Sequence, residues 1–273
     1  MATMTRVPNK PAAARSKNLL PLTRLRTLGL GLLGWLLFLG AWYWAAEADI
    51  APDRLFPGPD TVMASLYELL VEKNFAADIW ASTQRILTSF AIAIAIALPL
   101  GLLMGALKVV DQVLSPLTGA FRYLPAPAFI PLLLMWLGTG EAQKIALLII
   151  GVIFFLIIMI ADTTRQVPKV FLETAKTLGL PSYKILWSVI FRYSLPAYID
   201  LFRQMLAVSW TYLVIAEIVA ATDGIGAMMM RAKRFVHVDD IMAGILIIGI
   251  LGLLFDALFR LLHRLAFPYL HQR

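Results

Sequence analysis

The chain has 273 residues, of which 60% are hydrophobic and 15% are charged, and its mean hydropathy is +0.79. A soluble domain carries roughly a quarter charged residues and about half apolar ones, so the composition excludes an ordinary soluble protein. The sequence contains no cysteine and three histidines, which excludes disulfides and thiol catalysis and argues against a metal cluster. We therefore expect an integral membrane protein with several helices and no bound metal.

The net charge of +7 and the pI of about 9.7 have two possible explanations. A surface that binds nucleic acid would gather its cations among exposed aromatic side chains, but here the basic residues are scattered along the chain. Membrane proteins concentrate Lys and Arg in their cytoplasmic segments. We therefore expect the charge to reflect membrane orientation, with lipid around the chain and no nucleic-acid partner.

The N-terminal part predicts a retained membrane span. Residues 1–27 contain six basic side chains and no acidic one, and the apolar run 28–46 follows. A secretory signal peptide also begins with basic residues, but this run is long, ends in Trp42-Tyr43-Trp44 and lacks a small-residue cleavage site. Because Trp and Tyr are enriched at membrane interfaces, we expect a cytoplasmic N-terminus and a first transmembrane helix.

The remaining apolar blocks predict an all-α polytopic fold with six transmembrane helices. After the first, the predicted spans are 86–107, 113–137, 142–161, 196–221 and 241–262. Gly101 and Gly105 form a small-xxx-small pattern that permits close helix approach, and Pro99 predicts a kink in the same span. The block 113–137 contains four prolines, which break regular hydrogen bonding, so we expect it to line protein or a water-filled space.

The charges between the spans predict which side each loop faces. Residues 47–79 hold seven acidic and two basic side chains, and their amphipathic stretch 60–72 predicts an external helix. Residues 162–195 hold five basic and two acidic side chains, which is the polarity of a cytoplasmic loop. The loop 222–239 is predicted to be external, although its basic side chains oppose the positive-inside rule. The sixth span then returns the C-terminus to the cytoplasm.

The stretch 173–196 is a long amphipathic and charged segment between strongly apolar blocks. Gly179 is the residue type that ends a helix in the left-handed conformation, and Pro181 suits the first turn of the next helix. The sequence predicts a helix, a tight elbow and a second helix, with an apolar surface that includes Tyr183 and Trp187. A soluble-looking elbow on the cytoplasmic side indicates a partner outside the membrane.

Glu173-Thr174-Ala175, followed after three residues by Gly179 and later by Leu195-Pro196, resembles the cytoplasmic loop of ABC importer permeases. Thr174 stands where the family has Ala, and Phe191-Arg192 stands where these permeases often have Leu-Pro. The similarity extends over most of the chain and looks like the subgroup that imports nitrate, bicarbonate, or taurine and other sulfonates. The further segments that carry it are 55–59, 125–141, 216–217 and 244–256.

The resemblance implies the type I importer architecture in the bacterial inner membrane, with two permease copies, expected as a homodimer, around the pathway. Two cytoplasmic ATPase subunits would use ATP and Mg²⁺, and an external solute-binding protein would deliver the solute. The elbow 169–192 would be the coupling helix that docks on the ATPase. The chain itself has no Walker-type phosphate loop, so we expect a non-catalytic subunit that binds no cofactor.

The resemblance and the residue types together give two sets of candidate residues. The expected ATPase contacts are Glu173, Thr174, Ala175, Leu178, Gly179, Tyr183 and Trp187. The expected translocation path includes Arg122, Tyr123, Gln204, Trp210, Tyr212 and Glu217. Arg122 suits an anion pathway, but it equally suits a position near the membrane surface with its charge in water. The helical spacing of Asp200 and Arg203 predicts an ion pair, and we expect Asp256 to pair with a neighbouring basic residue.

Two other classes of protein and several substrates remain open. An intramembrane enzyme could use Asp200, Glu217 and Asp256, but the sequence has no His-Glu-x-x-His, Gly-x-Ser-x-Gly or paired-aspartate motif. A stand-alone channel or secondary carrier would need no docking site for ATPases. For the importer, nitrate with nitrite is the first expected substrate, and bicarbonate and taurine or other alkanesulfonates are the alternatives.

Overall fold

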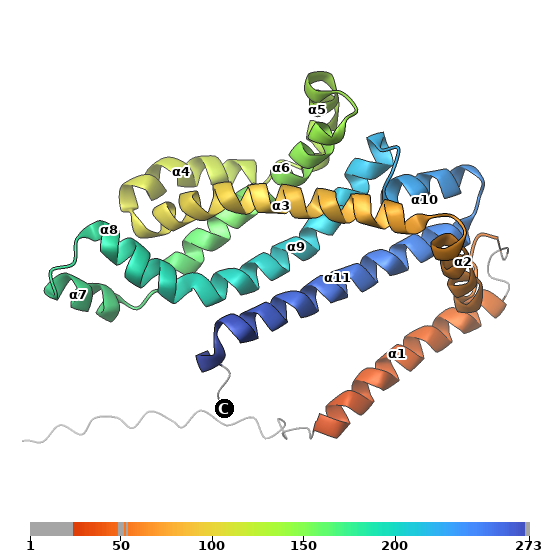
Figure 1. The fold of residues 1–273 in the computed structure, drawn as a ribbon, viewed down its shortest axis with the longest axis horizontal. Coiled ribbons are helices and arrows are strands. Elements are labelled where there is room, and N and C mark those ends of the chain that lie inside the picture. Colours follow the sequence, from red (N-terminus) through yellow and green to blue (C-terminus); the bar gives the residue numbers. More distant parts are fainter. Residues whose placement is uncertain (1–23, 49–51, 53, 271–273) are drawn as a thin grey trace, which may run out of the picture. The chain divides into compact units, whose positions relative to one another are not determined.

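The computed structural model describes residues 24–48, 52 and 54–270, and these residues form helices and turns with no strand (Figure 1). The chain divides into two compact units, residues 1–50 and 51–273. The first unit contains α1 (Arg24–Glu47), whose stretch Gly29–Glu47 is long and apolar enough to cross a membrane. This stretch corresponds to the predicted first span. Most of the basic segment 1–27 lies outside the described residues.

The second unit is a bundle of long helices, with shorter helices at its ends and along one side (Figure 1). Its long helices are α3 (Phe75–Ala106), α6 (Glu141–Arg165), α9 (Arg192–Ala220) and α11 (Val238–Ala266). The shorter elements are α2 (Pro59–Val71), α4 (Lys108–Phe121), η1 (Ala126–Phe129), α5 (Ile130–Leu137), α7 (Lys169–Thr177), α8 (Ser182–Lys184), η2 (Ile185–Phe191), α10 (Ile225–Arg234) and η3 (Pro268–Leu270).

Among the described residues, five helices could cross a membrane, or six if a bent pair counts as one span. The bent pair is the predicted span 113–137, which is not a single helix: α4 and the η1–α5 segment meet at 84°. Pro127 and Pro131 stand in the first turns of η1 and α5, where the missing N–H of proline leaves no intrahelical bond unmade. The prolines thus act as starts of new helices.

Two predicted spans are parts of longer helices. The helix of the second predicted span begins at Phe75, eleven residues before the predicted start at 86. The fifth belongs to a continuous helical segment of 39 residues, Ser182–Ala220, that includes part of the elbow. Apolar periodicity alone marks only the hydrophobic portion of such helices, because their polar ends do not match the hydropathy of the bilayer core.

Close backbone approach holds α3 against α6 and α6 against α9. A Cβ atom added to Gly101 would lie 2.7 Å from the carbonyl oxygen of Ile157, so the small-residue pattern of α3 does face a neighbouring helix. On α6, a Cβ atom added to Gly151 would lie 2.6 Å from the ring of Tyr212 on α9. The three helices therefore pack more closely than larger side chains would allow.

The amphipathic helix α2 packs against α11 through Val62, Leu66 and Leu69. The hydroxyl of Ser65 donates a 2.6 Å hydrogen bond to Asp240 at the start of α11. Lys73 contacts the same carboxylate at 3.4 Å. Burial acts to lower the pKa of Lys73, but its hydrogen bonds with Glu68 and Asp240 outweigh this effect and raise the pKa above its ordinary value.

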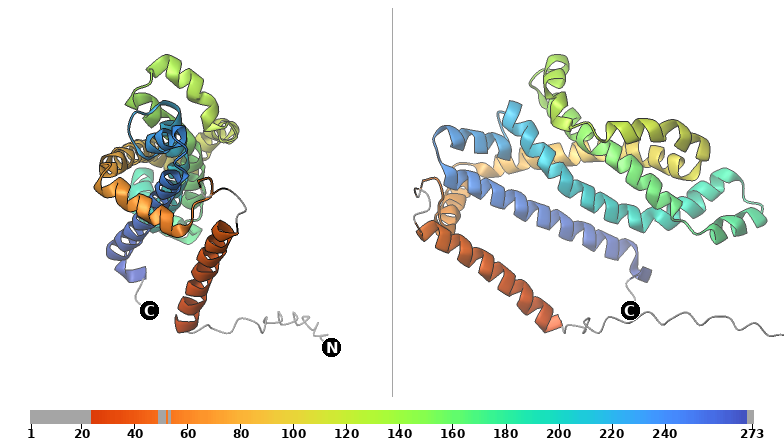
Figure 2. Two further views of the ribbon diagram at one scale, coloured as in Figure 1. Left: turned by 90° about the vertical axis from the view of Figure 1, so that its right-hand side faces the viewer. Right: turned by 180° about the vertical axis from the view of Figure 1, so that it is seen from behind.

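The bundle has two polar ends. In the view from behind (Figure 2), α7 and α8 lie at one end of the second unit and α10 lies at the other. Along α3, the 20 residue steps from Ser82 to Leu102 span roughly 30 Å at about 1.5 Å per residue, which is the thickness of a bilayer core. One end carries the elbow, and the other carries a cluster of charged side chains around Arg85.

Candidate functional site

The elbow is formed by a tight helix end and an immediate restart. The amide of Leu180 donates to the carbonyl of Ala175 at 3.1 Å, and the amide of Gly179 donates to Lys176 at 2.9 Å. This pair of bonds is the Schellman motif, which needs a left-handed residue, and Gly179 has φ +75°. Pro181 then precedes the first residue of α8. The predicted roles of Gly179 and Pro181 in the backbone are confirmed.

The inner face of the elbow is a small hydrophobic cluster. Ala175 of α7 and Ile185 and Ile190 of η2 are buried with Leu102 at the end of α3 and with Val167. The cluster fixes α7 and η2 against the end of the bundle. Ala175, predicted as an ATPase contact, is buried in this cluster, so it supports the elbow from inside.

The outer face of the elbow is exposed and largely apolar. Leu178, Tyr183 and Trp187 are exposed by 72%, 63% and 53%. Glu173, Thr174 and Gly179 are also exposed. Contiguous exposed apolar residues mark interaction surfaces, and six of the seven predicted contact residues are exposed.

The exit from the elbow is a π-helical segment. η2 runs from Ile185 to Phe191 and passes directly into α9 at Arg192, without a loop. Phe191-Arg192, where the sequence differs from the Leu-Pro that is frequent in ABC importer permeases, therefore coincides with the return from π-helix to α-helix. π-helical turns are rare and occur frequently at functional sites. No loop therefore separates the elbow from α9.

The residues predicted to line a path have different neighbours. Arg122 and Tyr123 lie at the bend after α4, are exposed, and contact each other through a 2.8 Å hydrogen bond and a cation–π contact. Trp210 is buried and its ring centroid lies 6.1 Å from that of Phe255. Half-buried Tyr212 packs on Gly151, Gln204 is exposed, and Glu217 is buried in a polar cluster.

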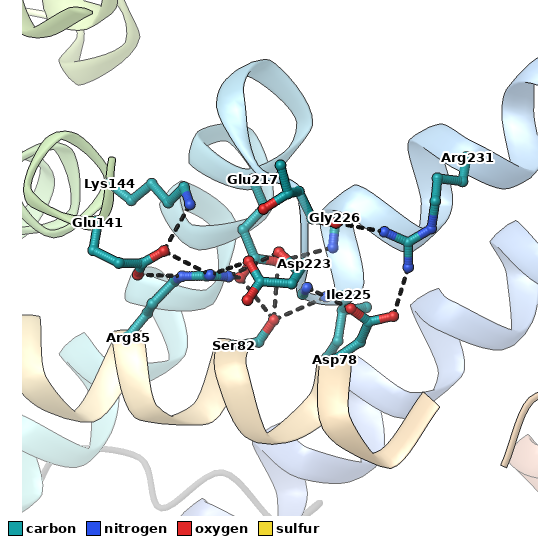
Figure 3. Close-up of polar contacts among 12 residues, drawn as sticks. Asp78, Ser82, Arg85, Glu141, Lys144, Glu217, Asp223, Ile225, Gly226 and Arg231 are labelled. Atoms are coloured by element: carbon teal, nitrogen blue, oxygen red, sulfur yellow. Dashed lines mark hydrogen bonds and ion pairs between the residues drawn. The ribbon is translucent and has the colours of Figure 1, made fainter. Parts of the chain in front are cut away.

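That polar cluster surrounds Arg85, which is only 4% exposed (Figure 3). All five N–H donors of its guanidinium are used: two bind Glu141, one binds Glu217, and two bind the side chain and carbonyl of Asp223. These partners come from α6, α9 and the turn before α10. Lys144 joins from α6 with a 2.7 Å contact to Glu141. A buried arginine without carboxylate partners would be strongly unfavourable.

The same cluster caps the first turn of α10. The amide of Gly224 donates to Asp78. The amide of Ile225 donates to the hydroxyl of Ser82, and that of Gly226 to Glu217 (Figure 3). Ser82 itself donates to Glu217 at 2.7 Å. The unsatisfied amides of a helix start are thus bound by side chains of α3 and α9. The arrangement fixes α10 to the end of the bundle.

Sequence reasoning missed Arg85 and Lys144. The predicted second span began at residue 86, so Arg85 fell into a loop, and Lys144 was counted among the residues of the fourth span without a role. A signal was present, because an ionisable residue within or next to an apolar span usually has a buried partner. Arg85 and Glu217 are both residues of this kind.

A second ionic group joins α9 and α11. Arg203 contacts Asp200 at 3.6 Å and Asp256 at 3.0 Å, and Arg260 also pairs with Asp256. The predicted pairings of Asp200 and Asp256 are confirmed. In the described part of the chain, no group of three or more His, Cys, Asp or Glu side chains is placed to hold a metal ion.

Comparison with known proteins gives consistent matches. The profile of the family described as binding-protein-dependent transport system inner membrane component matches residues 97–270. The taurine transport system permease protein TauC of Escherichia coli is 32% identical, over 91% of this chain and 92% of that protein. The putative aliphatic sulfonates transport permease protein SsuC of Bacillus subtilis is 28% identical, over 86% of this chain and 85% of that protein.

Solved structures share the fold. A chain of the MetNI methionine ABC transporter in an inward-facing conformation gives a TM-score of 0.61 with 20% identity, over 68% of this chain and 92% of that chain. A chain of an amino acid ABC transporter gives 0.57 with 19% identity, over 73% of this chain and 97% of that chain. The helical bundle, the sequence pattern of the elbow and the family match agree, and the chain belongs to the family of inner-membrane permease components of binding-protein-dependent ABC importers.

Proposed function

We propose that this chain forms, with a second copy of itself, the membrane pathway of an ATP-driven importer for small alkanesulfonates such as taurine. Two ATPase subunits dock on the elbow, and an external binding protein delivers the solute to the opposite end. The chain performs no hydrolysis itself. Closure of the ATPases moves the elbow, and the bundle alternates between outward and inward access.

The observation that carries this proposal is the construction of the elbow. Its inner face is fixed to α3 by a buried cluster, and its outer face exposes Leu178, Tyr183 and Trp187. The helical segment then continues without a loop to Ala220. An exposed apolar patch on a rigid extension of a transmembrane helix suits a docking site whose movement must reach the membrane pathway.

Sulfonates are favoured over the first expected substrate, nitrate. Two of the similar permeases named above are described as transporting taurine and aliphatic sulfonates, and neither name mentions nitrate or bicarbonate. A sulfonate carries a tetrahedral, singly charged head group and an organic tail, so it also offers apolar contacts that nitrate lacks. The similarity therefore supports the alternative that the sequence left open.

The test is uptake by the assembled transporter. The permease, its ATPase subunits and its binding protein are reconstituted in proteoliposomes, and ATP-dependent uptake of radiolabelled taurine is compared with that of nitrate and bicarbonate. We expect uptake of taurine to require both ATP and the binding protein. Uptake of nitrate or bicarbonate with no uptake of taurine would overturn the substrate assignment. Uptake of any solute without ATP would overturn the importer assignment.

A further inference from the structure

The turn between α10 and α11 has an unusual residue at a constrained position. The amide of His237 donates to the carbonyl of Ala232 at 3.0 Å, and the amide of Val236 donates to Lys233 at 3.2 Å. This is the same Schellman arrangement that ends α7 at the elbow. The left-handed position is occupied by Gly179 in the elbow but by Val236 here, with φ +59°.

A valine at this position is unfavourable for the isolated chain. A β-branched side chain in the left-handed region is a steric outlier, and glycine is the usual residue at such a helix end. Burial of the side chain does not compensate, because Val236 is 55% exposed. Backbone strain of this kind is concentrated at functional sites, where a constraint other than folding retains the residue. The observation points to a contact outside the chain.

The surroundings of Val236 form an exposed apolar ridge beside a hollow. Phe235 is 74% exposed, and it lies directly before Val236 in the turn. Both residues line a cavity of about 640 Å³. The other residues that line this cavity are Arg54, Pro57, Thr61, His237 and Asp239. An exposed apolar ridge beside a hollow is a surface to which a protein partner of complementary shape can bind.

Two exposed cations, Lys233 and Arg234, flank the ridge. Arg231 is engaged by Asp78 at 2.6 Å, but Lys233 and Arg234 are exposed, and no described carboxylate lies within ion-pair distance of either. These are the side chains that oppose the positive-inside distribution, so membrane orientation does not account for them. Their charge fits an acidic partner surface, which they would attract over a distance of several ångströms.

The position of this turn relates it to transport. α9 begins next to the elbow and ends at Ala220, and α10 follows at the other end of the bundle (Figure 2). The buried cluster around Arg85 fixes the start of α10 to α3 and α9. A partner bound at the end of α10 would therefore act on the end of the bundle opposite to the ATPases.

We propose that residues 233–237 are a docking surface for an acidic face of the external solute-binding protein. This inference rests on the proposed importer function and adds the contact residues on the external side. Lys233 and Arg234 attract the partner, and Phe235 and Val236 form the apolar centre of the contact. The hollow beside them receives a projecting part of the partner.

The test uses the complete transporter in lipid nanodiscs, with purified, solute-loaded binding protein added in increasing amounts. ATP hydrolysis is measured, and the binding-protein concentration for half-maximal stimulation is determined. We expect the double variant Lys233→Glu/Arg234→Glu to raise this concentration about tenfold or more at low salt, with a smaller difference at high salt. Hydrolysis without binding protein should be unchanged. The matched control is Lys108→Glu/Arg264→Glu, which reverses two exposed cations at the elbow end and should leave the half-maximal concentration unchanged.

A second variant separates docking from folding. Val236→Gly relieves the backbone strain and removes the exposed side chain, so we expect equal or higher thermal stability together with a several-fold higher half-maximal concentration. Unchanged half-maximal concentrations in both variants would overturn the docking surface. The docking surface is also overturned if Phe235→Ser lowers the amount of protein inserted in the membrane but leaves the half-maximal concentration unchanged. The ridge would then be a lipid anchor. If the binding protein does not stimulate the unaltered transporter, the importer function itself fails.

Discussion

The guanidinium of Arg85 donates to the carboxylate of Glu217 at 2.8 Å, and both side chains are almost completely buried. The pair joins α3 to α9 at the end opposite the elbow. Glu217 also receives bonds from Ser82 and from the amide of Gly226. One carboxylate thus holds two long helices and the start of α10 in register.

We predict that Glu217→Ala lowers the free energy of unfolding by about 3 kcal/mol. Removal of one member of a buried ion pair typically costs about 3–5 kcal/mol, and the low end applies because Glu141 and Asp223 still neutralise Arg85. The measurement is thermal unfolding of the purified protein in detergent. Glu68→Ala is the control: Glu68 and its partner Lys73 are both about half exposed, so the loss of Glu68 should cost about 1 kcal/mol or less. Equal effects of the two variants would contradict this role of Glu217.

Gly224→Ala should destabilise the same end of the molecule. Gly224 has φ +106°, and an added Cβ atom would lie 2.5 Å from the Glu217 carboxylate and 2.6 Å from Arg85. Backbone strain and overpacking together should cost about 2 kcal/mol or more. Gly140 has an ordinary φ of −76° and open space around it, so Gly140→Ala should unfold close to the unaltered protein. The unfolding midpoints of both variants test the geometry, and a stable Gly224→Ala protein would argue against it.

These contacts explain which features the sequence could predict. The elbow and the Asp200–Arg203 pair depend on residues close together in the chain, so local rules were sufficient. Arg85 and Glu217 are 132 positions apart, and their contact depends on the register of three helices, which hydropathy does not encode. The prolines of residues 113–137 indicated a break but not its 84° angle. Val236 at a glycine position contradicts residue preference, so only the backbone geometry revealed it.

Gly179→Val should separate ATP hydrolysis from transport. The space around Gly179 is open within this chain, and Val236 occupies the same motif at the end of α10, so we expect the variant to fold and insert. Its new side chain would project from the exposed face of the elbow and strain the turn by about 1–2 kcal/mol. The ratio of solute transported to ATP hydrolysed in proteoliposomes should fall severalfold or more.

Gly179→Asn provides the comparison for this prediction. Asn adopts the left-handed conformation more readily than other side chains, so it relieves the strain but keeps a side chain on the elbow surface. Normal coupling in Gly179→Asn with poor coupling in Gly179→Val would assign the effect to strain. Poor coupling in both would assign it to the surface. Unchanged transport per ATP in both variants would remove Gly179 from the coupling mechanism.

Tyr183→Asp should weaken attachment of the ATPase subunits. Tyr183 is 63% exposed on the outer face of the elbow, and a carboxylate there would have to be desolvated on docking, so we expect roughly a tenfold loss of co-purified ATPase. Tyr269 has the same exposure, 63%, in the short helix after α11, and Tyr269→Asp should retain the ATPase. Both permeases should be recovered from the membrane in normal amounts, because neither side chain is part of the core. Equal retention of the ATPase by the two variants would mean that the outer face of the elbow is not the docking surface.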